Sequence, residues 1–229
     1  MPPAVLVRPS RGAGVVRLVL QAGASVGGTA WVMGYASGST ALVSLAPFAG
    51  AAALGSMLPA TGLLARPVLG VRTRHARLAL TFDDGPDPTW TPRVLDLLER
   101  TRHARLALTF DDGPDPTWTP RVLDLLEAHG QRGTFFVIGA RAAAHPALLR
   151  AVVARGHELA NHTWAHGYGT AFVPPRSLAR ELRRVDDLLE AEVGVRSRWF
   201  RPPVGVVSPW VARGAAGARL TLVTWSAAA

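Results

Sequence analysis

The sequence predicts an α/β fold in which helices cover a mostly parallel sheet. From residue 73 to residue 225, short apolar runs of strand length alternate with helical patterns. The turns between them are rich in Gly and Pro, and several strand ends carry Asp, His or Arg. The residues alone leave open whether the sheet is flat or closed into a barrel.

Composition indicates a folded chain without a nucleic-acid partner. Of 229 residues, 48% are apolar and 18% are charged, which excludes a disordered chain or a coiled coil. There is no Cys, which excludes a disulfide scaffold, a Cys-based zinc site and a cysteine nucleophile. The net charge of +9 comes from Arg alone, because the chain contains no Lys. With one Asn and one Ile, this usage indicates a GC-rich coding sequence rather than phosphate binding.

Residues 1–70 form an apolar region that we expect to anchor the chain in a membrane. Residues 18–65 contain no charged residue, and arginines flank them on both sides. One or two spans are predicted, at about 15–36 and about 41–65, each near the ~20 residues that a bilayer requires. The alternative is a buried, Ala-rich layer of soluble helices. One span would place the rest of the chain outside the cell, and two would return it to the cytoplasm.

An exact internal repeat follows. Residues 73–99 and 101–127 are identical, which indicates a recent tandem duplication or an error in the sequence. Each copy reads as a strand (RLALTF), a turn (DDGPDP) and a helix (RVLDLLE). Thr91 and Thr119 are predicted N-caps, each followed by a proline at the first helical position.

The alternation continues after the second copy. Strands are predicted at 134–139, 157–162, 199–203 and 220–225, and helices at 146–155, 177–193 and 209–217. The helix at 177–193 has an apolar face that consists of Leu178, Leu182, Val185, Leu188 and Leu189.

Three groups of polar residues at strand ends could carry chemistry. Asp111 and Asp112 follow a strand, so one could bind a cation while the other acts as a base. His162 and His166 are spaced so that both imidazoles can face one point, and with one carboxylate they suit Zn²⁺. Arg201 can hold a carboxylate through two hydrogen bonds. Taken singly, each group is more often part of a solvated surface loop.

Together these pieces resemble a known family. TFDDGP occurs at 81–86 and 109–114, HTWAH at 162–166 and RPPVG at 201–205, and GTFFVIG, RGHELANHTWAH and LVTWS flank them. Their order resembles the NodB-homology polysaccharide deacetylases, carbohydrate esterase family four, over about 104–226. The resemblance implies a distorted (β/α) barrel that removes N-acetyl groups from the amino sugars of a polysaccharide or peptidoglycan.

The resemblance also implies roles for individual residues. Asp112, His162 and His166 would hold a divalent metal, with zinc first and cobalt, nickel or manganese as alternatives. Asp111 would be the general base, and Arg201 would orient it. The backbone N–H of Val204, where the family usually has Tyr, would help to hold the oxyanion.

The family's last two motifs are expected after LVTWS, and one of them supplies a histidine that protonates the leaving amine. We therefore expect residues 101–229 to be a truncated domain, and His129, His145 and His157 to be turn and surface residues. An alternative is a catalytically impaired remnant that binds metal or glycan. A third is a structural membrane protein. The family context favours a membrane-anchored domain outside the cytoplasm that acts on an N-acetylated glycan.

The repeat raises the question of which copy works. The second copy runs directly into QRGTFFVIG, so we expect Asp111 and Asp112, not Asp83 and Asp84, to form the site. The strand at 77–82 is predicted to pair in parallel with 105–110, on the side opposite 134–138. It would fill the gap left by the truncation and place Asp83 and Asp84 at the rim. The alternative is that residues 73–100 pack nowhere on the domain.

Overall fold

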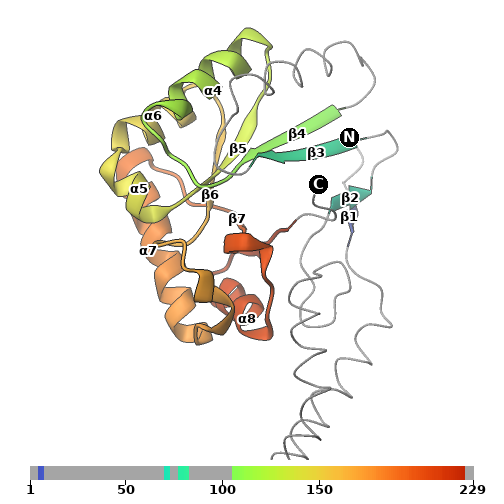
Figure 1. Ribbon diagram of the computed structural model, residues 1–229, viewed down its shortest axis with the longest axis vertical. Coiled ribbons are helices and arrows are strands. Elements are labelled where there is room, and N and C mark those ends of the chain that lie inside the picture. The colour runs from blue at the N-terminus through green and yellow to red at the C-terminus, as the bar shows by residue number, and fades with distance from the viewer. Residues whose placement is uncertain (1–4, 8–69, 73–76, 83–104, 225–229) are drawn as a thin grey trace, which may run out of the picture.

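The computed structural model describes residues 5–7, 70–72, 77–82 and 105–224 (Figure 1). The predicted spans at 15–36 and 41–65, the first-copy helix, Asp83 and Asp84 lie outside these residues. Within the described ranges, no helix has the length and apolar character that a membrane crossing requires.

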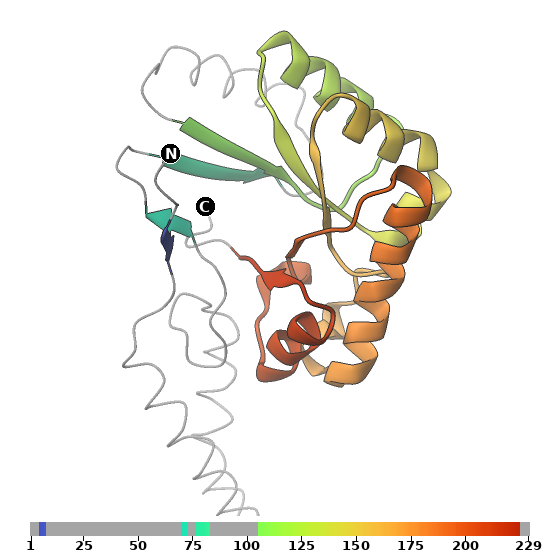
Figure 2. The same cartoon turned by 180° about the vertical axis from the view of Figure 1, so that it is seen from behind.

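A curled, wholly parallel sheet forms the centre of the domain, and helices lie along its outer side (Figures 1 and 2). Its order among the described residues is β3-β4-β5-β6-β7-β8, so each strand pairs with the next along the chain. The strands are β3 (Arg77–Phe82), β4 (Arg105–Phe110), β5 (Gly133–Val137), β6 (Glu158–Asn161), β7 (Trp199–Phe200) and β8 (Thr221–Leu222). A separate antiparallel pair joins β1 (Val5–Val7) to β2 (Gly70–Arg72).

The strand of the first copy pairs with the strand of the second, as predicted. β3 and β4 are parallel and in exact register, from Arg77 opposite Arg105 to Phe82 opposite Phe110, and β5 lies on the other side of β4. Because the copies are identical, like residues meet. The rings of Phe82 and Phe110 stack with centroids 5.4 Å apart, and the Thr81 and Thr109 hydroxyls are 2.8 Å apart. The repeat therefore extends the sheet by one matching strand.

The helices are α4 (Trp118–Ala128), α5 (Gly139–Ala144), α6 (Pro146–Ala154), α7 (Pro175–Val193) and α8 (Pro209–Gly217). Two 3₁₀ turns, η2 (Tyr168–Phe172) and η3 (Pro203–Gly205), lie in the loops after β6 and β7. The sequence predicted α4, α6, α7 and α8 but not α5, because Gly139 was assigned to the strand at 134–139 and residues 140–145 to no element.

The predicted N-cap of α4 is wrong. The helix begins at Trp118 with Thr117 as its N-cap, so Thr119 lies inside the first turn. The carboxylate of Asp115 accepts hydrogen bonds from the N–H groups of Thr117 and Trp118, each at 2.8 Å. An acidic acceptor four residues before the predicted cap therefore starts the helix earlier.

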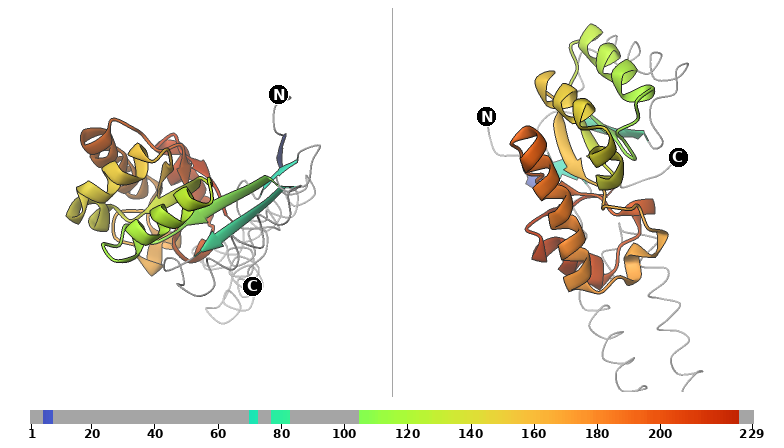
Figure 3. Two further views of the ribbon diagram at one scale, coloured as in Figure 1. Left: turned by 90° about the horizontal axis from the view of Figure 1, so that it is seen from above. Right: turned by 90° about the vertical axis from the view of Figure 1, so that its left-hand side faces the viewer.

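Two clusters of buried side chains form the core. The larger lies between the sheet and α4, α6 and α7, the helices that face the viewer in the right panel of Figure 3. The smaller joins the first half of α7 to α8, β7 and β8. At Gly214, a Cβ would meet Leu178 Cδ2 at 2.7 Å, so α8 packs directly on α7. The predicted face of α7 is inside, with Leu178, Leu182, Val185 and Leu189 buried. This packing fixes the strand ends that carry the candidate site.

Candidate active site

The candidate residues lie where β4, β6 and β7 end. Asp111 and Asp112 follow β4, His162 follows β6, and Arg201 follows β7. Main-chain hydrogen bonds hold these ends together: His162 N–H donates to Val137 O at 3.0 Å, and Arg201 N–H donates to Asn161 O at 3.1 Å. Since all strands of the central sheet are parallel, the four side chains emerge at one edge of that sheet.

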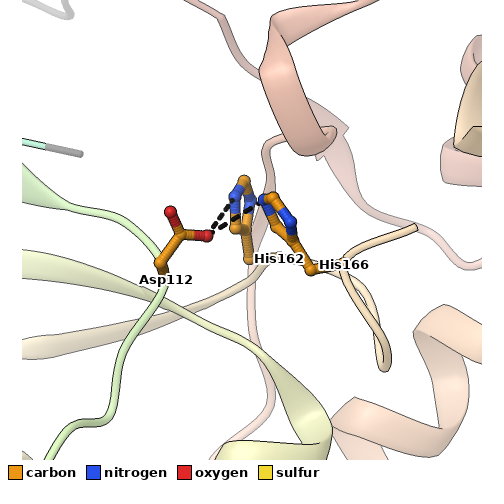
Figure 4. A group of neighbouring side chains, drawn as sticks. All are labelled: Asp112, His162 and His166. Carbon is orange, nitrogen blue, oxygen red and sulfur yellow. Dashed lines mark ion pairs between the residues drawn. The ribbon is translucent and has the colours of Figure 1, made fainter. Parts of the chain in front are cut away.

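Two of them, Asp112 and His162, converge on one point with His166, which lies four residues after His162 (Figure 4). Asp112 Oδ1 lies 3.4 Å from His162 Nε2 and 3.0 Å from His166 Nε2. One ligand atom from each residue lies within 4.8 Å of the other two. His162 is buried, whereas Asp112 and His166 are partly accessible. This carboxylate and two imidazoles form a donor set that zinc and similar cations accept.

The hydrogen bond behind His162 fixes its tautomer. His162 Nδ1 lies 2.7 Å from the main-chain oxygen of Arg201. A carbonyl oxygen can only accept, so Nδ1 carries a proton, and in the neutral imidazole Nε2 then presents its lone pair toward Asp112 Oδ1. Two acceptor atoms that face each other favour a cation between them. The same outer hydrogen bond typically orients metal-binding histidines.

The backbone of the site is in a rarely populated conformation. Asp112, His166 and Val204 have positive φ angles of 67°, 52° and 51°. Non-glycine residues rarely adopt this region, and for β-branched Val204 it is a clear outlier. Such strain typically concentrates where side chains or main-chain groups must be aimed for function. Arg141 supports the first of these residues by donating to the main-chain oxygen of Asp112 at 2.6 Å.

Asp111 and Arg201 form a buried ion pair next to the three ligands. Each is only 3% exposed. Arg201 Nη1 donates to Asp111 Oδ1 at 2.7 Å and to Thr109 Oγ1 at 3.0 Å, and the guanidinium lies 4.1 Å from the ring centroid of Phe136. A hydrogen-bonded arginine keeps a buried carboxylate ionised and in a fixed orientation.

Comparison with known proteins identifies the family. The family model described as polysaccharide deacetylase matches residues 99–223. The chain belongs to the polysaccharide deacetylase family. A chitooligosaccharide deacetylase of Sinorhizobium fredii is 44% identical over 64% of this chain and 55% of its own length. A peptidoglycan-N-acetylglucosamine deacetylase of Bacillus cereus is 39% identical over 65% of this chain and 56% of its own length.

The chain thus spans just over half the length of these curated relatives. Among solved structures, a mutant of a CE4 family pseudoenzyme superposes with a TM-score of 0.50 and 20% identity. The superposition covers 69% of this chain and 48% of the pseudoenzyme chain. That likeness supports the fold alone.

Sequence reasoning missed the residues that hold the loop between His162 and His166. Glu181 of α7 accepts hydrogen bonds from the N–H groups of Trp164 at 3.0 Å and Ala165 at 3.3 Å. The guanidinium of Arg184, one turn further along α7, lies 3.4 Å from the ring centroid of Trp164. These contacts position the residues between the two histidines. No sequence pattern shows that Glu181 faces this loop.

A second missed group lies beneath the loop. Asn161 accepts a hydrogen bond from Thr163 N–H and donates to Leu182 O and to the carboxylate of Asp186. Ser197 also donates to Asp186. Burial raises the pKa of Asp186, and the hydrogen bonds from Ser197 and Asn161 partly counter that rise. The signal for Asp186 was present, because it is a charged residue on the apolar face of the predicted helix.

Of the remaining candidates, Val204 lies on η3 with its side chain half exposed. Asp83 and Asp84 lie outside the described residues. The interpretation of His157 as a surface residue is wrong. It is buried, its Nδ1 accepts from Gly133 N–H at 3.2 Å, and its ring meets Phe135 edge-on. Burial, together with Arg132 and Arg155, lowers the pKa of His157, so its neutral form is favoured in the folded state.

Proposed function

We propose that this chain hydrolyses N-acetyl groups from the amino sugars of a polysaccharide or peptidoglycan, with a divalent metal held by Asp112, His162 and His166. The observation that carries the proposal is the convergence of these three ligand atoms beside a buried Asp–Arg pair. The names of the relatives, deacetylases of chitooligosaccharides and peptidoglycan, point to the same class of substrate.

The donor set fits zinc first, with cobalt, nickel or manganese as alternatives. Three protein ligands with one side open to solvent match a catalytic rather than a structural site. When bound, the cation supplies Lewis acidity, which polarises the acetamide carbonyl and lowers the pKa of water. His162 is oriented for this role, because the hydrogen bond from its Nδ1 to Arg201 O makes Nε2 the ligand atom of the neutral imidazole.

Asp111 acts as the general base in this proposal. It accepts a proton from the water that attacks the acetamide carbon, and this proton passes to the leaving nitrogen as the C–N bond breaks to give acetate and an amine. Arg201 is a positioning residue, because it touches Asp111 and not the reacting atoms. The main-chain N–H of Val204 donates to the oxygen of the tetrahedral intermediate. The left-handed backbone at Val204 is the supporting observation for a main-chain role there.

We also propose that residues 15–65 anchor the domain to a membrane and that it works outside the cytoplasm. The support for an anchor is the uncharged stretch at 18–65, and the location outside the cytoplasm corresponds to a single span. Cell fractionation, with protease treatment of intact cells, tests this. The domain should remain in the membrane fraction and be cleaved from outside. A soluble or fully protected chain would refute the proposal.

The experiment that tests the function measures acetate release and metal content together. The chain is freed of metal with a chelator, reloaded with Zn²⁺, and incubated with N-acetylated chitin oligomers or peptidoglycan. Metal with acetate release supports an enzyme. Metal without acetate release on any substrate indicates a remnant that binds but does not turn over. A chain that neither binds metal nor releases acetate would be only a scaffold. Asp112→Ala should remove both properties.

A further inference from the structure

An exposed apolar surface adjoins the candidate site. Among the described residues, the large apolar side chains with high exposure are Phe172 at 80%, Tyr168 at 79%, Val204 at 50% and Trp210 at 44%. They come from η2, η3 and α8, and η2 contacts both of the other elements. Exposed apolar groups that gather in one place, rather than singly, typically mark a binding surface.

One member of this surface, Tyr168, lies directly against a proposed metal ligand. The ring of Tyr168 meets the imidazole of His166 edge-on, with centroids 6.0 Å apart and planes at 81°. The turn that carries Tyr168 and Phe172 is also held in place. Thr170 Oγ1 donates to Gly167 O at 2.6 Å, and Ser208 Oγ donates to Ala171 O at 2.7 Å. The two rings are therefore presented on a turn that is tied to its surroundings.

The chemistry of this surface favours an uncharged ligand with flat apolar faces. Neither η2 (YGTAF) nor η3 (PVG) contains a charged residue. Aromatic rings offer a large, stiff contact area at little cost in conformational entropy, and they suit ligands that are apolar on one side and polar at the edge. A pyranose ring has this character, with C–H groups on its faces and hydroxyls around its edge.

We propose that Tyr168 and Phe172 form a sugar-binding surface that holds the units of the glycan next to the one that is deacetylated. This inference rests on the proposed function, and it makes the enzyme prefer oligomers over single sugars. Tyr168 and Phe172 are specificity-determining residues in this account. They act on substrate affinity and not on metal binding.

The test measures binding of the N-acetylglucosamine tetramer by calorimetry. The zinc-loaded full chain carries Asp111→Asn so that substrate is not consumed. Phe172→Leu and Tyr168→Leu keep apolar bulk but remove the ring. Each should weaken binding about fivefold, equivalent to about 1 kcal/mol, as expected for loss of one aromatic contact. Phe172→Trp should retain affinity, and zinc content should be the same in all these chains.

The matched control is Trp199→Leu. The Trp199 indole donates to Glu158, the first residue of β6, and so lies at the opposite end of the strand from His162. This variant should bind the tetramer as the parent does. The inference is overturned if the leucine variants bind like the parent, or if the parent does not bind the tetramer. Acetate release by the chain with Asp111 intact is measured separately. If it is absent while the leucine variants weaken binding, deacetylation fails and the sugar-binding surface stands.

Discussion

Replacing Arg201 with Met should strongly destabilise the domain. Arg201 and Asp111 are each 3% exposed, so removing the guanidinium takes the arginine partner from a buried carboxylate. Breaking a buried pair in this way typically costs about 3–5 kcal/mol, and the lost bond to Thr109 adds about 1 kcal/mol. The sum is a large share of the ~5–15 kcal/mol that stabilises a typical domain.

Urea unfolding of four chains measures this effect: wild type, Arg201→Met, Asp111→Asn and the double variant. The double variant removes both charges, so it should be more stable than Arg201→Met, and the coupling energy should reach about 2–3 kcal/mol. Additivity of the two single changes to within about 0.5 kcal/mol would refute the buried-pair reasoning. Arg201→Met should leave the hydrogen bond to His162 intact, because that bond uses the main-chain oxygen of residue 201.

Three further predictions concern catalysis, positioning and pH. Asp111→Asn should retain zinc but lower the rate of acetate release at least ~10²-fold, and unchanged release would exclude Asp111 as the base. Glu181→Leu should weaken zinc binding about 10–100-fold, because it removes the acceptor of the N–H groups of Trp164 and Ala165. Glu181→Gln keeps an acceptor and should weaken zinc binding less. Equal effects of the two variants would show that these hydrogen bonds do not matter. The lowered pKa of His157 means that the unfolded chain takes up a proton first as the pH falls below about 6.5, so folding stability declines there. His157→Asn, which keeps an acceptor for Gly133, should reduce that decline in urea unfolding, and an unchanged pH dependence would contradict it.

Much of this architecture was predictable because its signals are local. Alternating apolar runs and Gly- or Pro-rich turns predicted the strands β4 to β8, and the exact repeat predicted that β3 would pair with β4 in register. The sequence also indicated that Asp112, His162 and His166 lie close together. Asp112 and His162 follow the carboxyl ends of parallel strands, and His166 lies four residues after His162. Strand direction alone then places them at one edge.

The features that sequence reasoning missed depend on contacts between distant segments. The residues around His157 have the composition of a surface turn. Only the packing of Phe135 against its ring and the hydrogen bond from Gly133 N–H show that it is buried. Glu181 looks like any charged residue of an amphipathic helix until its carboxylate meets the loop at 164–165. The start of α4 depends on which nearby side chain reaches the first free N–H groups, and Asp115 competes successfully with Thr119.

The repeat offers the most direct test of the central proposal, that the second copy holds a metal with His162 and His166. Zinc per chain is measured by equilibrium dialysis and elemental analysis for the wild type, Asp112→Ala and Asp84→Ala, the same change in the first copy. The wild type and Asp84→Ala should each bind one zinc ion at this site, and Asp112→Ala should lose it. A wild type that binds no zinc, or loss of zinc in Asp84→Ala but not in Asp112→Ala, would contradict the account.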